Sequence, residues 1–362
     1  MSDMTVGKPE RAPAASGFNW RRLVRGQEIG IFAVLVVMIL FFTLATASSG
    51  SFVRPTNITN ILLNFSWTAI AAFGMTMVII SAGIDLSVGS VMALAGLAAA
   101  VLLSSEKSPF AVDKTIADGV IIIGVAAGLG VGALCGFVNG LLITFARLPP
   151  FIATLGMLQI ARGIVYGYSQ GWPVQNLPQN FMVLGRQNIP VAGQNIPLPS
   201  LIMLVIGVIA WLFLTRTTWG YRIFAVGGNE QAARLSGISV TRTKLMIYTL
   251  SGLLAGAGGV LLTARLGVAA PTAAQGYELD VIAAVVVGGT SLSGGEGSIL
   301  GTLIGAAIMG VLRTGLNLIG VEAYWLPAAQ GLIIILAITL DQWYRRRQGK
   351  AVGFARLFGG KG

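Results

Sequence analysis

Long apolar segments recur along almost the whole chain, and they constrain its fold more than any other feature. A helix of about 20 apolar residues, rising 1.5 Å per residue, crosses the hydrocarbon core of a bilayer. Ten apolar segments are candidates for such helices: Ile29–Ala47, Trp67–Ile80, Val91–Leu103, Gly119–Phe145, Phe151–Tyr168, Ser200–Leu214, Leu245–Ala264, Leu279–Val287, Ser298–Leu312 and Tyr324–Leu340. The sequence therefore predicts an all-α integral membrane protein with about ten transmembrane helices. Leu279–Val287 is too short to cross by itself.

Composition agrees with a membrane location. The 362 residues are 55% hydrophobic and 10% charged, with a mean hydropathy of +0.80. A soluble domain carries about 25% charged residues, so a surface of this composition could not face water on every side. We expect one polytopic membrane domain over residues 29–340, between a disordered cytoplasmic tail (1–28) and a basic cytoplasmic tail (341–362).

Positive charges predict the orientation. If the N-terminus is cytoplasmic, 17 of the 24 Lys and Arg residues fall on the cytoplasmic side and six outside, while Arg162 lies within a span. Cytoplasmic loops of bacterial membrane proteins are enriched in these residues. Both termini, and the basic loop 216–244, are therefore expected in the cytoplasm, with the chain a multi-pass protein of the bacterial plasma (inner) membrane.

Several function classes are disfavoured by what the chain contains. The net charge of +11 sits in segments flanking apolar spans, which matches an anionic membrane surface and not nucleic acid. The sequence has no histidine, which removes His-based metal sites and general bases. Its single cysteine, Cys135, allows no intrachain disulfide. We predict no catalytic residues, metal or cofactor on this chain.

Two apolar segments are interrupted by similar sequences. Gly83-Ile-Asp85-Leu-Ser87 and Gly289-Thr-Ser291-Leu-Ser293 each follow a Val/Ile run and precede a helix rich in small residues. Paired interruptions in two halves of a transporter indicate a transport pathway. Chance similarity of Gly/Ser-rich loops is the alternative, and the residues fit a parallel or an inverted repeat.

A glycine stripe predicts close helix packing. Gly residues recur every four positions, at Gly124, Gly128, Gly132, Gly136 and Gly140. Small residues at this spacing let a neighbouring backbone approach closely.

The basic loop contains a short segment with its own start and stop signals. Asn229 is a favoured N-cap, Glu230 suits the positive helix start and Arg234 the negative end. Gly237 fits the left-handed position after a helix. We predict a short capped helix there, either a coupling element or a simple surface connector.

The same loop carries a family resemblance. Gln231-Ala232-Ala233, three residues, then Gly237 resembles the EAA-x-x-x-G loop of ABC importer permeases, with Gln for Glu and without the usual Ile-x-Leu-Pro continuation. Over roughly residues 29–340 the chain is similar to ribose/xylose/galactose-type permeases, in the runs Ala225–Asn229, Ala232–Ile238, Gly83–Gly89, Gly140–Phe151 and Val287–Ser291.

The resemblance implies a set of partners. Asn229, Glu230, Gln231, Ala232, Ala233, Arg234 and Gly237 would form a coupling helix that docks on a cytoplasmic ABC ATPase. ATP and Mg would be bound there, which agrees with the lack of a phosphate-binding loop in this sequence. An extracytoplasmic sugar-binding protein, and a second permease copy or a paralogue, would complete the importer.

Polar residues at membrane depth are candidates for the translocation path, because burying them in a bilayer is costly. They are Asp85, Asn64, Phe65 (as an aromatic stacking surface), Asn139, Gln159 and Asn317. Asp85 has an alternative role, as the cap of a helix beginning at Leu86.

The function predicted from these residues and the resemblance is import of a monosaccharide or sugar-like small molecule, energised by a separate ATPase. The main alternative is an ion-gradient-coupled secondary transporter that uses an acid such as Asp85. Ribose, xylose, galactose, a polyol and a sugar-like signalling molecule are all compatible with the sequence.

Overall fold

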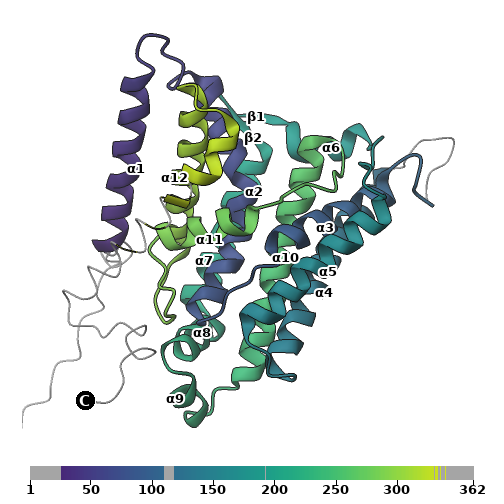
Figure 1. The fold of residues 1–362 in the computed structure, drawn as a ribbon, viewed down its shortest axis with the longest axis vertical. Coiled ribbons are helices and arrows are strands. Elements are labelled where there is room, and N and C mark those ends of the chain that lie inside the picture. Colours follow the sequence, from purple (N-terminus) through teal and green to yellow (C-terminus); the bar gives the residue numbers. More distant parts are fainter. Residues whose placement is uncertain are drawn as a thin grey trace, which may run out of the picture.

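A computed structural model describes residues 26–109, 118–191 and 193–329, together with four positions between 331 and 339. The chain is a bundle of α-helices with one small hairpin (Figure 1). The elements are α1 (Gly26–Ala45), α2 (Pro55–Ile80), α3 (Val88–Leu103), α4 (Asp118–Thr144), α5 (Pro150–Ser169), α6 (Gln179–Arg186), β1 (Asn188–Val191), β2 (Gln194–Pro197), α7 (Leu198–Arg216), α8 (Thr218–Gly228), α9 (Glu230–Leu235), α10 (Val240–Leu266), α11 (Tyr277–Val287) and α12 (Ile299–Leu318), followed by a 3-10 turn at Ala323–Trp325. Residues 1–25 of the predicted N-terminal tail, the predicted C-terminal tail and part of the predicted tenth span lie outside the described residues. The predicted disordered tail extends too far, because its last three residues, Gly26–Glu28, already belong to α1 and Glu28 is buried.

Six of the described helices are long and apolar enough to cross a membrane: the apolar parts of α1, α2, α4, α7, α10 and α12. Three other predicted spans fall short for physical reasons. α3 has only 16 residues and α11 only 11. α5 has 20 residues, but Gln159 and Arg162 lower its hydropathy.

Helix α2 forms the centre of the bundle. From Phe65 to Ile80 every residue is buried, and a helix that is apolar on all sides belongs in the interior of a bundle. α10, α12, α11 and α7 pack around it. In Figure 1, α1 stands on one side of the bundle, α3, α4 and α5 on the other, and α10 between them.

The polar segment 169–199 is more ordered than a plain loop. It contains α6 and the antiparallel hairpin of β1 and β2, in which Ile189 faces Ile196 across the strands. Proline then starts the next helix, since Pro199 occupies an early position of α7 where its missing N–H costs nothing.

The two interruptions have matching backbone geometry. α2 ends with a hydrogen bond from Gly83 N to Val78 O (3.0 Å), and α11 with one from Thr290 N to Val285 O (3.1 Å). The left-handed residues before them are Ala82 (φ 61°) and Gly289 (φ 83°). The structural match is therefore Ala82 with Gly289, one residue away from the predicted match of Gly83 with Gly289, because the left-handed residue that ends each helix sets the equivalence.

The glycine stripe of α4 faces α10 at its centre. A Cβ on Gly132 would lie 2.4 Å from Gly252 O, and one on Gly136 would lie 2.1 Å from Tyr248 O. Gly124, at one end, meets the side chain of Leu103 instead. The two helix backbones thus come close because neither side presents a side chain there.

This contact gives a stability prediction. We expect Gly136→Ala to destabilise the protein by about 1–3 kcal/mol, since the added methyl overlaps the α10 backbone. Gly130→Ala on the same helix is the matched control, because nothing lies within 4 Å of its Cβ position. Thermal unfolding in detergent measures both, and equal melting temperatures would contradict the packing described.

Candidate functional site

The short helix α9 lies at one end of the bundle, next to α8 (Figure 1). Asn229 is its N-cap, and its Oδ1 accepts a hydrogen bond from Ala232 N at 2.9 Å. Gly237 follows the helix with φ 81°, and Ile238 N donates to Ala233 O at 3.0 Å. Both ends therefore have the geometry predicted from the sequence, and the helix starts and stops independently of its neighbours.

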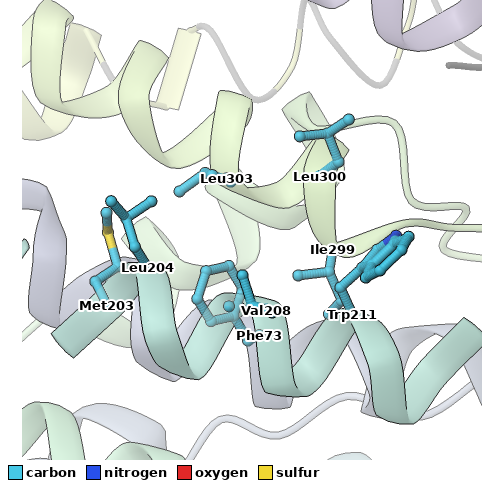
Figure 2. A pocket seen from close by; sticks show the side chains of 9 residues that line it. Phe73, Met203, Leu204, Val208, Trp211, Ile299, Leu300 and Leu303 are labelled. Carbon is cyan, nitrogen blue, oxygen red and sulfur yellow. The ribbon is translucent and has the colours of Figure 1, made fainter. Parts of the chain in front are cut away.

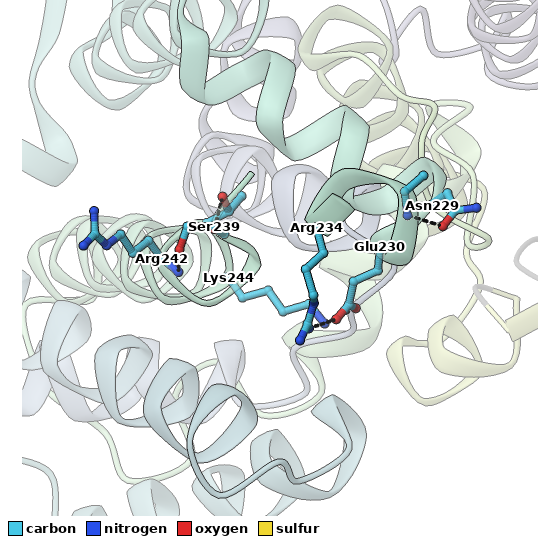
Figure 3. Close-up of polar contacts among 8 residues, drawn as sticks. Asn229, Glu230, Arg234, Ser239, Arg242 and Lys244 are labelled. Atoms are coloured by element: carbon cyan, nitrogen blue, oxygen red, sulfur yellow. Dashed lines mark hydrogen bonds and ion pairs between the residues drawn. The ribbon is translucent and has the colours of Figure 1, made fainter. Parts of the chain in front are cut away.

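Glu230 ties α9 to the beginning of α10 (Figure 3). Its Oε2 accepts a hydrogen bond from Lys244 Nζ at 2.7 Å, and its Oε1 from Arg234 Nη2 at 3.1 Å. The hydrogen bond from Lys244, reinforced by Arg234, holds the pKa of the Glu230 carboxyl below its ordinary value. A depressed carboxyl pKa stabilises the folded state above the ordinary pKa and loses that contribution on acidification, so this link is intact at neutral pH.

The two faces of α9 differ in exposure. Ala233 is buried against Val226 and Val240, so its side chain points into the loop. Leu235 is 90% exposed, and Gln231, Ala232 and Arg234 are also exposed. Sequence reasoning named Ala233 among the coupling residues and omitted Leu235. The helical phase could have shown the difference, because two residues along a helix turn the side chain by about 200°.

The residues before α9 contact both helix interruptions. A Cβ on Gly227 would lie 1.6 Å from Ile80 O, at the end of α2. Gly295 N donates to the same Ile80 O at 2.8 Å. A Cβ on Gly294 would lie 2.7 Å from Gly227 O and 3.0 Å from Ala82 N. We call this meeting of three backbones, formed by Ile80–Ala82, Gly227 and Gly294–Gly295, the glycine junction.

Asp85 lies at the centre of a buried polar network. Its Oδ1 accepts from Ser87 N (3.0 Å) and Ser87 Oγ (2.6 Å), and its Oδ2 from Ser251 Oγ (3.1 Å). Asn139 Nδ2 donates to Ser87 Oγ at 3.0 Å. The network thus fastens the first interruption to α4 and α10.

The capping hypothesis for Asp85 needs correction. α3 begins at Val88, not at Leu86. Asp85 accepts from the backbone two residues on, which is a local Asx turn ahead of the helix.

Removing the Asp85 side chain should destabilise the protein more than removing one of the hydrogen-bond donors that contact it. We expect Asp85→Ala to destabilise the protein by about 3 kcal/mol, because it leaves three donors without their acceptor, and Ser251→Ala by about 1 kcal/mol. Thermal unfolding of the two variants in parallel gives the order. A larger effect of Ser251→Ala would show that Asp85 does not organise the network.

The other predicted path residues lie in separate places. Asn64 and Phe65 line a small cavity of about 20 Å³ together with Asp280 and Arg313. That volume is about enough for one water molecule. Arg313 Nη2 donates to Asp280 Oδ2 at 2.8 Å beside it, an ion pair that sequence reasoning did not find. Gln159 on α5 and Asn317 on α12 are exposed.

Metal chemistry finds no support in the described ranges. No group of three or more His, Cys, Asp or Glu side chains within them could hold a metal ion. The buried carboxylate that stands out, Asp85, is engaged by serine hydroxyls and a backbone N–H.

These features are those of a polytopic membrane transport protein: a helical bundle, two helix interruptions and an exposed, capped helix. Comparison with known proteins specifies the family. The family model described as "Branched-chain amino acid transport system / permease component" matches residues 57–338. The chain belongs to this family of transport-system permeases.

Curated relatives cover nearly the whole chain. Ribose import permease protein RbsC of Bacillus subtilis (strain 168) is 42% identical over 318 residues, covering 87% of this chain and 93% of the relative. RbsC of Escherichia coli (strain K12) is 43% identical, covering 85% and 92%. Xylose transport system permease protein XylH of the same strain is 33% identical, covering 92% and 96%. No solved structure matches the chain.

Membership of this permease family defines the general role of the chain. The chain is a multi-pass membrane permease of a bacterial ABC importer. It is a transport subunit and not itself catalytic, and subunits of this family carry no cofactor because the ATPase is separate.

Proposed function

We propose that the chain imports a pentose or a similar monosaccharide, with ribose as the first candidate. The substrate class is supported by relatives of 42% and 43% identity that are ribose import permeases, and by a 33% identical xylose permease. The ATPase subunit binds the outer face of α9, an extracytoplasmic sugar-binding protein delivers the substrate, and a second copy or a paralogue completes the membrane part.

The proposed membrane arrangement has ten crossings with both termini in the cytoplasm. The loop 216–244, which contains α8 and α9, is then cytoplasmic, in agreement with its basic residues. α3 and α11 are short because each lies next to an interruption and covers only part of the membrane thickness.

The glycine junction is the observation that supports the mechanism best. Movement of α9 on its ATPase is transmitted through Asn229 to Gly227, which contacts the backbone at the end of α2 and the loop after α11. Because these contacts involve backbone atoms with no flexible side chain between them, a displacement of α9 shifts both interruptions together. Switching the pathway between inward and outward openings follows from that shift.

The path itself includes Asp85, Asn64, Phe65, Asn139, Gln159 and Asn317 in this proposal. Gln159 and Asn317 are exposed on the single chain, where an amide facing lipid would be costly. A second permease packed against such a face gives these amides a polar surrounding.

Co-purification tests the proposed partnership. The tagged chain is extracted in mild detergent, and the proteins that accompany it are identified. A stoichiometric ATPase, lost when residues 231–237 are replaced by a Gly/Ser sequence, is the expected result. A partner-free chain that transports sugar in liposomes without ATP would favour the ion-gradient mechanism instead.

A further inference from the structure

An apolar groove opens between α7 and α12 on the side of the bundle (Figure 2). Its cavity is about 340 Å³, within the range of small-molecule sites in proteins. Phe73 of α2 lies at its floor, and Val208 and Leu303 lie on its two walls. Gly207 also lines the groove, and the lack of a side chain there lets the Phe73 ring approach α7, since a Cβ would lie 3.2 Å from that ring.

A polar cavity continues this groove toward the end of α7. It measures about 390 Å³ and shares Trp211 and Leu300 with the apolar cavity. Arg216, the last residue of α7, and the exposed Tyr221 of α8 line it. The lining of the groove therefore changes from apolar to charged along α7, in the direction in which this helix crosses the membrane.

The charges at the polar end suit an anion. Arg216 is exposed and forms no ion pair with a carboxylate in the described part of the chain. Glu28 also lines this cavity, but it is buried and its Oε1 accepts a hydrogen bond from Ser298 Oγ at 2.6 Å. The exposed charge at the mouth is thus the guanidinium, which binds phosphate oxygens well.

We propose that this groove is a phospholipid site. One acyl chain fills the apolar cavity beside Phe73 and Gly207, and the phosphodiester binds Arg216 with the Tyr221 hydroxyl beside it. Trp211 lies where the two cavities meet, and tryptophan and tyrosine favour the boundary between hydrocarbon and headgroups. Basic pockets between membrane helices bind lipid headgroups in this way.

The site has a consequence for the permease. The polar cavity is also lined by Gly295, Gly297 and Ser298 of the second interruption. A phospholipid there contacts the base of the α8–α9 loop and this interruption at once. The proposal depends on the chain being a membrane permease and not on the coupling role of α9.

Lipid retention tests the site. The full chain is purified in mild detergent with its partners, washed to remove bulk lipid, and the phospholipid left per protein is measured by mass spectrometry. Gly207→Leu fills the groove and Arg216→Gln removes the headgroup partner. The matched controls are Gly130→Leu, on an open face of α4, and Arg222→Gln, whose guanidinium lies 4.8 Å from the Trp219 ring centre.

We expect wild type and both controls to retain a phospholipid, and Arg216→Gln to lower its retention about fivefold. Gly207→Leu should abolish it while the protein stays monodisperse. If Gly207→Leu does not fold, a photoreactive phosphatidylglycerol tests the site instead. We expect it to crosslink to the wild type and not to Arg216→Gln. Equal retention in all four variants, a retained lipid without phosphate, or no retained lipid in wild type would overturn the proposal.

Discussion

Leu235→Asp is expected to weaken binding of the ATPase subunit by about a hundredfold while leaving the permease folded, because the interface would bury a carboxylate without a partner in place of an apolar side chain. Leu235 is 90% exposed on α9 and is the most exposed of the large hydrophobic side chains described. The charge would face the partner and disturb nothing inside the permease. Titration of detergent-solubilised permease with purified ATPase measures the change.

Two further variants make this result specific. Thr241→Asp adds the same charge to an exposed position in the first turn of α10, in the same loop, and should bind normally. Ala233→Glu should behave differently from Leu235→Asp, because it places a charge between Val226 and Val240 and detaches α9 from the permease. Wild-type affinity in Leu235→Asp would show that the ATPase does not bind this face.

Gly227→Ala is expected to lower sugar uptake at least tenfold, although the ATPase stays bound. The added Cβ would overlap Ile80 O at 1.6 Å, so the glycine junction must open and α9 loses its contact with both interruptions. Uptake in vesicles, with ATPase co-purification in parallel, separates failed coupling from failed assembly.

Gly228→Ala is the control for the junction. It is the adjacent glycine of α8, and nothing lies within 4 Å of its Cβ position. It should transport normally. If Gly227→Ala and Gly228→Ala take up sugar equally well, the junction does not carry the movement of α9.

Local signals predicted α9 well. The Asn229 cap and the left-handed Gly237 are set by residues within the same short segment, so they could be inferred without knowing the rest of the fold. The helical phase shows that Ala233 and Leu235 lie on different faces of the helix. It does not show which face packs on the permease, because that depends on Val240 of the next helix. For that reason the predicted coupling residues include the buried Ala233 and omit the exposed Leu235.

Contacts between segments that are far apart in the chain could not be predicted from the sequence. The interruptions were visible from glycine and serine, but the contact between Gly227 and Ile80 joins residues in different helices. Likewise, the sequence suggested Asp85 as a cap or path residue, whereas Ser251 and Asn139 complete its network from α10 and α4. Hydropathy showed that the segments of α3 and α11 are short, but it could not show how each packs next to an interruption.

Sugar uptake into proteoliposomes tests the central proposal most directly. The permease is reconstituted with its ATPase and its sugar-binding protein, and labelled ribose uptake is followed with ATP or a non-hydrolysable analogue on the ATPase side, with and without an ion gradient. We predict uptake that requires ATP hydrolysis and continues when ionophores remove every gradient. Uptake that proceeds without ATP and stops with the gradient would contradict the proposed mechanism.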